Sequence, residues 1–178
     1  MDVIEKIHEY ASIWTFFGFL VAALAVLVMM GFFYQSRIVA ITGGLQILDM
    51  RPWYSFEDAV QLFTLLGQDG RTLYTQHQIL DAIFPILFGT TLSQGIARMN
   101  SLRDEQDIRW RQLALLPYLE TFFDYLENFL IGTQIISFPV LSPFVIISAC
   151  VATIMKWSLL ILSGVILVGL AAEYVLSG

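Results

Sequence analysis

Apolar residues fall into four long stretches separated by polar or turn-rich connections. The first stretch, residues 13–33, reads IWTFFGFLVAALAVLVMMGFF and contains no charged residue. At about 1.5 Å per residue, a helix of this length covers a hydrocarbon core of roughly 30 Å. A signal peptide is the alternative, but the stretch is too long for a signal core, follows the acidic leader MDVIEKIHEY and lacks a small-residue cleavage site. We therefore expect a first membrane span at residues 13–33.

The second and third apolar stretches are also expected to span the membrane, although both carry polar residues. Residues 78–99 contain Asp81 and Pro85, and residues 112–136 contain three acidic residues. Ionisable side chains are costly in hydrocarbon, so they must face other helices or water. Both predicted spans should therefore pack with their polar sides turned inward.

The last apolar run, residues 138–176, is longer than one perpendicular span. A span at residues 143–170 must tilt, break at Gly164 or Gly169, or extend past the bilayer. With it the chain is predicted to be a single all-α domain, an integral membrane four-helix bundle of residues 1–178.

The long connection between the first two spans carries the signals of a short helix. Ser55 stands three residues before Asp58, as in a capping box, and an apolar stripe then runs to Gly67. We expect an extramembrane amphipathic helix at about residues 56–66, lying on the bilayer surface or capping the bundle, and a turn at GQDG into the second span.

Composition agrees with a membrane protein and excludes several other classes. Hydrophobic residues make up 57% of the chain and charged residues 13%, against about 25% in soluble domains, and the mean hydropathy is +0.73. The net charge of -6, without any Lys/Arg run, argues against nucleic-acid binding. One cysteine excludes an intrachain disulfide or redox pair, and two histidines are too few for histidine-rich di-iron sites.

Arginines cluster in the connection after the second span. ARMNSLRDEQDIRWRQ holds four of them, whereas the connection before the fourth span, residues 137–142, carries no charge. Because Lys/Arg excess marks the cytoplasmic side, the arginine connection and both termini are expected in the cytoplasm. Without a transit peptide or N-x-S/T acceptor, the expected location is a bacterial inner membrane, with lipids as neighbours.

Polar residues recur at helical spacing on three of the predicted spans, so each set falls on one helix face. The three sets are Arg71, Tyr74, Gln78, Asp81 and Pro85 on the second span; Pro117, Glu120, Asp124, Glu127 and Asn128 on the third; and Thr153, Lys156 and Ser163 on the fourth. Three inward polar faces predict one interior site.

Counting depth from the loop ends predicts two layers in this site. The central layer joins Lys156 to Asp124 and Glu120, which are the candidate catalytic residues. The outer layer and its neighbours complete the predicted ligand-binding set: Arg71, Tyr74, Asp81, Glu127 and Asn128, with Trp157 beside Lys156. Buried ion pairs that only fix helix register are the alternative interpretation. His77 and Asp81, at i and i+4, could share a metal, but we expect neither a metal nor another cofactor.

Ordered motifs add a resemblance over roughly residues 47–160. They are the run ILDMR, Tyr54 with Ser55, GRxxY from Gly70, DxxFP from Asp81, PxxExxxDYxEN from Pro117 to Asn128, and the pair Lys156 and Trp157. In this order the motifs resemble an uncharacterised family of small four-span bacterial membrane proteins, which implies four spans but no activity. The architecture is also loosely similar to the emopamil-binding-protein and sigma-2 receptor group.

Three functions are compatible with a buried acidic site. The first is binding or processing of a lipophilic small molecule or lipid, with Glu120 or Asp124 as a general acid tuned by Lys156. The second is a proton or cation relay for transport. The third is a structural accessory subunit whose ionic core only fixes packing. The sequence contains no Walker loop, G-x-S-x-G or H-E-x-x-H motif that would indicate another chemistry.

Overall fold

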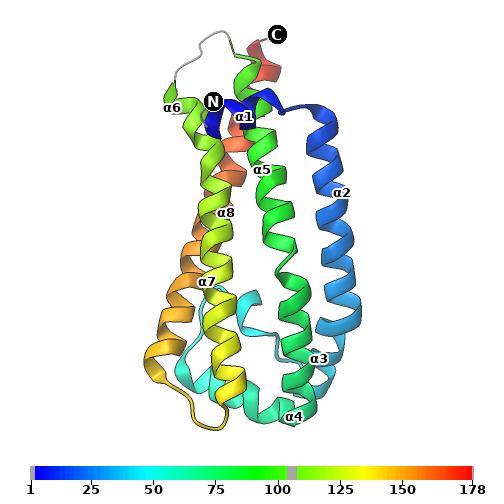
Figure 1. The fold of residues 1–178 in the computed structure, drawn as a ribbon, viewed down its shortest axis with the longest axis vertical. Helices are drawn as coiled ribbons and strands as arrows, with labels where there is room; N and C mark the ends of the chain where they lie inside the picture. Colours follow the sequence, from blue (N-terminus) through cyan, green and yellow to red (C-terminus); the bar gives the residue numbers. More distant parts are fainter. Residues whose placement is uncertain (1–2, 104–107, 178) are drawn as a thin grey trace.

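The computed structural model describes residues 3–103 and 108–177, and these residues are nearly all helical, with no strand among them (Figure 1). The elements in chain order are α1 (Val3–Glu9), α2 (Ile13–Met30), the π-helix η1 (Gly31–Gln35), α3 (Ser36–Thr42), the 3-10 turn η2 (Leu48–Met50), α4 (Phe56–Asp81), α5 (Phe84–Ser101), α6 (Ile108–Gln112), the 3-10 turn η3 (Leu113–Leu115), α7 (Leu116–Ser137) and α8 (Pro143–Ser177). The predicted all-α fold is confirmed. Part of the predicted arginine connection, residues 104–107, lies outside the described residues.

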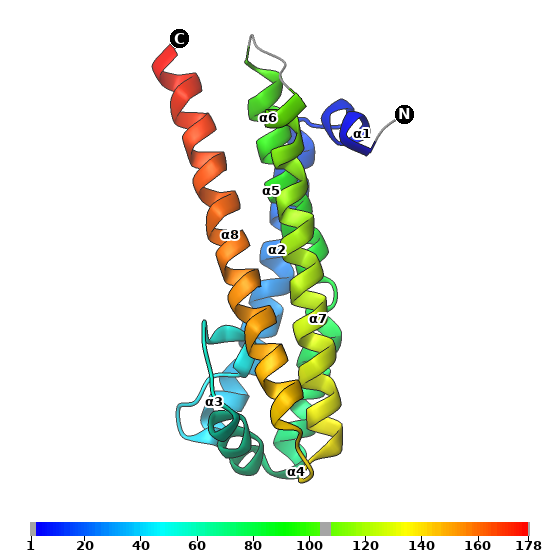
Figure 2. The ribbon, with the colours of Figure 1, turned by 90° about the vertical axis from the view of Figure 1, so that its left-hand side faces the viewer.

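Long helices run side by side along the molecule (Figures 1 and 2). The most extensive contacts are between α7 and α8 and between α2 and α5, while α5 also packs against α7 and α8. α2 packs on α5 rather than on α8. The first and last described residues lie at the end that holds α6, and the α3–α4 and α7–α8 connections lie at the other end.

Three helical segments are long and apolar enough to cross a membrane: Ile13–Thr42, Phe56–Ser101 and Pro143–Leu176. They correspond to the first, second and fourth predicted spans. α7, the third predicted span, is not one of these segments because Glu120, Asp124 and Glu127 all lie within its 22 residues.

The first and last of the long helices, α2 with its continuation and α8, are longer than the sequence pattern predicted. The first helix does not end at residue 33 but continues through the π-helix η1 and α3 to Thr42. α8 is unbroken from Pro143 to Ser177, so the possible break at Gly164 or Gly169 does not occur. Both glycines lie within the continuous α-helix, and a Cβ added at either position would meet no atom within 4 Å.

The predicted second span is divided between two helices. α4 ends at Asp81 and α5 begins at Phe84, with Pro85 in the first turn of α5. A proline has no N–H and a fixed φ, so it suits the first turn of a helix and disfavours its interior. The predicted span over residues 78–99 therefore contains a helix break between Asp81 and Phe84, within the apolar segment Phe56–Ser101.

The predicted amphipathic helix forms the first part of α4. Ser55 and Asp58 make the expected capping box, and Gly67 interrupts the helix with φ 60°. A positive φ favours glycine because a Cβ would clash with the backbone. Among the buried residues of this part are Leu62 and Phe63, which belong to the main apolar core. The helix therefore caps one end of the bundle.

The segment between α3 and α4 enters the bundle instead of remaining at its surface. Ile47 and Leu48 are fully buried and Asp49 is 5% exposed. The Tyr74 hydroxyl accepts a hydrogen bond from the Leu48 N–H at 3.0 Å and donates one to Asp49 Oδ1 at 2.8 Å. These two bonds hold η2 against α4, in the part of the bundle that lies nearer to α3 (Figure 2).

Candidate functional site

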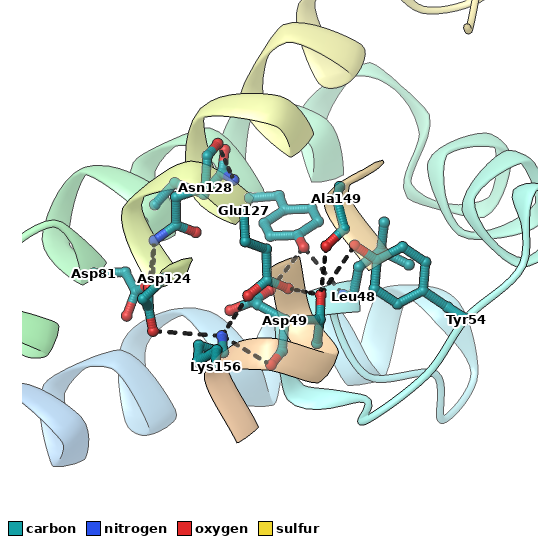
Figure 3. A network of polar contacts seen from close by, with 12 residues as sticks. Leu48, Asp49, Tyr54, Asp81, Asp124, Glu127, Asn128, Ala149 and Lys156 are labelled. Atoms are coloured by element: carbon teal, nitrogen blue, oxygen red, sulfur yellow. Dashed lines mark hydrogen bonds and ion pairs between the residues drawn. The ribbon is translucent and has the colours of Figure 1, made fainter. Parts of the chain in front are cut away.

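Lys156 on α8 is at the centre of a buried polar cluster (Figure 3). Its Nζ lies 2.5 Å from Glu127 Oε2 and 3.4 Å from Asp124 Oδ2, both on α7. It also donates a hydrogen bond to the Asp49 carbonyl oxygen at 3.4 Å. An ammonium group has three donors, and here each has an acceptor. The pairing predicted between Lys156 and Asp124 is present, and Glu127 joins it.

Helical spacing explains why these side chains meet. Asp124 and Glu127 are three residues apart on α7, as are Thr153 and Lys156 on α8, so each pair shares one face of its helix. Thr153 Oγ1 donates to Glu127 Oε1 at 2.5 Å and lies 3.2 Å from the Tyr54 hydroxyl. The closest contacts of the cluster therefore form along the extensive α7–α8 interface.

Asn128 connects the cluster to α4. Its Nδ2 donates to Asp81 Oδ2 at 2.7 Å and to Asp124 Oδ1 at 3.0 Å, which uses both hydrogens of the amide. Gln78 Nε2 on α4 donates to the Asn128 backbone carbonyl at 3.2 Å. α4, α7 and α8 are thus joined by one continuous set of hydrogen bonds and ion pairs.

A cavity of about 510 Å³ adjoins this cluster. Its polar lining consists of Gln35, Asp49, His77, Asp81, Glu120, Asp124 and Lys156. Its apolar lining consists of Leu27, Met30, Gly31, Met50, Phe84, Phe88, Trp157 and Leu160. The cavity therefore brings together α2, η1, η2, α4, α5, α7 and α8 and is lined by both acidic and apolar side chains.

Several polar atoms of the cavity lining are buried without a hydrogen-bond partner. They are Glu120 Oε2, His77 Nδ1 and Trp157 Nε1. Glu120 is only 4% exposed, so water at the protein surface does not satisfy its carboxyl group. Buried polar atoms in proteins are nearly always paired, and exceptions often mark a position that a ligand or water fills.

The cluster departs from the two predicted layers. Glu127, expected in the outer layer, contacts Lys156 directly, and Asp81 reaches Asp124 through Asn128. The division into two layers is therefore wrong, because Asp124 and Glu127 belong to one network.

Arg71 lies outside this network. Its Nη1 donates to the Phe63 carbonyl at 2.8 Å, and its guanidinium lies 4.3 Å from the centre of the Phe138 ring. Tyr74, predicted near the outer layer, is fully buried and holds η2 through Asp49. Arg71 thus bridges the kink of α4 at Gly67 instead of pairing with Asp81 or Glu127.

Asp49 and His77 are the site residues that sequence reasoning missed. Asp49 belongs to the ILDMR run, and its position between the apolar residues Leu48 and Met50 is the only local signal that it could be buried with other polar groups. His77, considered from the sequence as a possible metal ligand with Asp81, is 2% exposed and lines the cavity. Its spacing of four from Asp81 places both on the inner face of α4.

Acidic groups outnumber basic groups in this region. Five acidic side chains, Asp49, Asp81, Glu120, Asp124 and Glu127, surround or adjoin the cavity, and Lys156 is the one basic side chain among its described lining residues apart from His77. Because Arg71 lies outside the network, the excess of acidic over basic side chains is greater than the predicted set of site residues indicated. Lys156 already contacts two of the carboxyl groups, so the acidic residues that line the cavity mainly offer hydrogen-bond acceptors.

Comparisons with protein-family models, curated proteins and solved structures give no significant match. The cavity and the side chains around it are therefore the basis for assigning a function.

Proposed function

We propose that this chain is an integral membrane protein whose interior cavity binds a lipophilic small molecule or lipid. The observation that carries the proposal is a cavity of about 510 Å³ lined by both acidic and apolar side chains. Small-molecule sites usually measure about 300–1,000 Å³ and combine an apolar lining with a few placed polar groups. The apolar side chains would contact the body of the ligand, and the acidic side chains would contact its polar end.

Exposed apolar side chains support membrane integration. Val28 on α2 and Val165 on α8 are 67% and 63% exposed, although polar groups such as Glu127 are fully buried. A surface more apolar than the interior is expected where lipid is the solvent.

α7 is the proposed third span, which brings the number of spans to four. Its carboxyl groups face the cluster, while Phe122, Phe129 and Ile136 are exposed on other sides of the helix. This distribution explains how a helix with three acidic residues can lie in a bilayer. The motif resemblance to four-span bacterial membrane proteins agrees with the proposal.

The proposed orientation places the arginine connection and both termini in the cytoplasm of a bacterium. In a Cys150→Ala background, an impermeant maleimide should label Ser137→Cys in intact spheroplasts. Ser101→Cys, at the other end of the bundle, should react only after permeabilisation. The reverse labelling pattern would contradict the orientation.

Processing of the ligand would use Glu120 as the general acid. Asp124 is held by Lys156 and Asn128, whereas Glu120 lines the cavity and its Oε2 has no hydrogen-bond partner. A general acid must reach the substrate atom that receives the proton. Of the two predicted candidates, Glu120 is therefore better placed.

Mass spectrometry of the protein extracted directly into polymer nanodiscs tests the binding function. We expect a lipophilic molecule to copurify in stoichiometric amount with the wild type and with the exposed-site control Glu57→Gln. Its amount should fall strongly in Glu120→Leu. If wild-type protein retains only bulk lipid in the proportions of the surrounding membrane, the proposal is wrong.

The continuous path of hydrogen bonds and ion pairs from Asp81 through Asn128, Asp124 and Lys156 to Glu127 favours a proton relay as the second candidate. Proton flux into proteoliposomes that is abolished by Asp124→Asn would support the relay. A structural accessory role would instead leave both ligand retention and flux absent.

A further inference from the structure

We infer that the ligand of this cavity carries a hydrogen-bond-donating head without negative charge, an alcohol or an amine on a lipophilic body, and that Glu120 accepts its hydrogen bond. The inference rests on the proposed binding function and specifies its ligand class. It excludes phospholipids and fatty acids, whose heads are phosphates and carboxylates.

The first step is that the Lys156 ammonium group is already surrounded by acceptors of the protein. Its Nζ contacts Glu127 Oε2, Asp124 Oδ2 and the Asp49 carbonyl, which matches the three donors of an ammonium group. Asn128 likewise uses both amide hydrogens, on Asp81 and Asp124. A phosphate or carboxylate would have to displace one of these acidic side chains from its partner.

The surrounding carboxyl groups also oppose an anion. Asp49, Asp81, Glu120 and Asp124 all line the cavity, and like charges at short range repel strongly in a desolvated site. The buried donors without a partner in the described lining are ring N–H groups, Trp157 Nε1 and, in one tautomer, His77 Nδ1. When His77 is neutral, neither ring carries a positive charge, which a buried phosphate or carboxylate head would require.

The second step is that Glu120 offers an unused acceptor. Its Oε2 is buried without a partner, and the whole residue is 4% exposed. A carboxyl group keeps acceptor capacity whether it is ionised or protonated. An O–H or N–H donor on the ligand would therefore satisfy Glu120 in either state.

The third step is the position of Glu120 in the cavity. It is four residues from Asp124 on α7, and Leu160 is four residues from Lys156 on α8, so each lies one turn from the cluster. α7 and α8 run in opposite directions (Figure 1), which puts both displacements toward the same end of the bundle. Glu120 therefore lies where acidic lining meets apolar lining, as the head of an amphiphile requires.

Trp157 provides a reporter for the test because it lines the cavity. The other tryptophans, Trp14, Trp53 and Trp110, are replaced by Phe. The protein is placed in phosphatidylcholine nanodiscs, and fluorescence quenching is measured with terminally brominated dodecanol, dodecylamine and dodecanoic acid. These probes share one chain and differ only in the head. Release of quenching by unbrominated dodecanol separates cavity binding from partition into lipid.

We expect saturable, displaceable quenching by the alcohol or the amine, and only partition-dependent quenching by the acid. Glu120→Leu should weaken binding of the donor-headed probe by about tenfold or more, because its hydrogen bond loses its acceptor. Glu57→Leu, the same change at an exposed site on α4, should leave binding unchanged. Glu120→Gln keeps an acceptor oxygen, so it should preserve alcohol binding within about threefold and weaken amine binding more.

Saturable binding of the acid with equal or higher affinity than the alcohol and the amine would overturn the inference while leaving the binding function standing. Saturable quenching by none of the probes would overturn the inference, and the copurification experiment then decides the binding function separately. If Glu120→Leu does not fold, the comparison of the three probes on wild-type protein and on Glu120→Gln still decides between these outcomes.

Discussion

Lys156 on α8 and Glu127 on α7 form a buried ion pair, with 2.5 Å between Nζ and Oε2. Glu127 is fully buried and Lys156 is 7% exposed. Removing one partner of such a pair leaves an uncompensated charge in the interior. We expect Lys156→Met to lower the free energy of unfolding by about 3–5 kcal/mol, measured in mild detergent by circular dichroism.

The double variant Lys156→Met/Glu127→Gln controls for this effect. It should lose less stability than the sum of the two single variants, because the second change removes the charge that the first leaves unpaired. Equal stability of Lys156→Met and the wild type would show that the ion pair does not hold α7 to α8.

Glu120 and Glu127 should respond oppositely to the same substitution, although both are buried on α7. Glu120 Oε2 has no partner, so Glu120→Leu removes an unsatisfied buried group and should raise the thermal midpoint of the ligand-free protein. Glu127→Leu removes an acceptor of Lys156 and Thr153 and should lower it. Thermal unfolding of both variants in the same detergent measures the difference, and a fall of similar size in both would contradict a ligand role for Glu120.

Asn128 should contribute through its two donated hydrogen bonds. Asn128→Leu leaves Asp81 and Asp124 without that donor, and we expect a loss of about 1–3 kcal/mol in the free energy of unfolding. The neighbouring change Phe129→Leu, at a side chain that is 68% exposed, should have little effect in detergent. Equal losses in the two variants would argue against the bridging role of Asn128.

Gly89 marks a close approach of α5 to α7. A Cβ at Gly89 would overlap Thr121 Oγ1 and lie 3.1 Å from the Pro117 carbonyl oxygen. Gly89→Ala should therefore reduce stability by about 1–3 kcal/mol, as overpacking does. Gly164→Ala meets nothing within 4 Å and should instead stabilise α8 by up to about 1 kcal/mol. Chemical unfolding of both variants checks the contrast, and a stabilising Gly89→Ala would contradict this packing.

Local signals in the sequence were sufficient for much of the fold. Long apolar runs predicted α2 and most of α8, and the Ser55–Asp58 capping box with Gly67 predicted the first part of α4. The entry of η2 into the bundle could not be predicted in this way. It depends on hydrogen bonds between Tyr74 and residues about 25 positions earlier, and no local pattern encodes such a contact.

The candidate site was predictable in composition but not in pairing. Helical spacing correctly put Asp124 and Glu127 on one face of α7. Depth counted from loop ends then separated Glu127 from Lys156, because such counting assumes straight, perpendicular helices with known ends. Arg71 was assigned to the site by spacing alone, yet it binds the Phe63 carbonyl across the Gly67 kink, which only the three-dimensional structure reveals.

An experimental structure of the protein in a lipid nanodisc tests the central claim most directly. We predict elongated non-protein density in the cavity, with its polar end within hydrogen-bonding distance of Glu120 and its body against Phe88 and Leu160. A cavity closed by its own side chains, or a cluster in which Lys156 no longer contacts Asp124 and Glu127, would contradict the account.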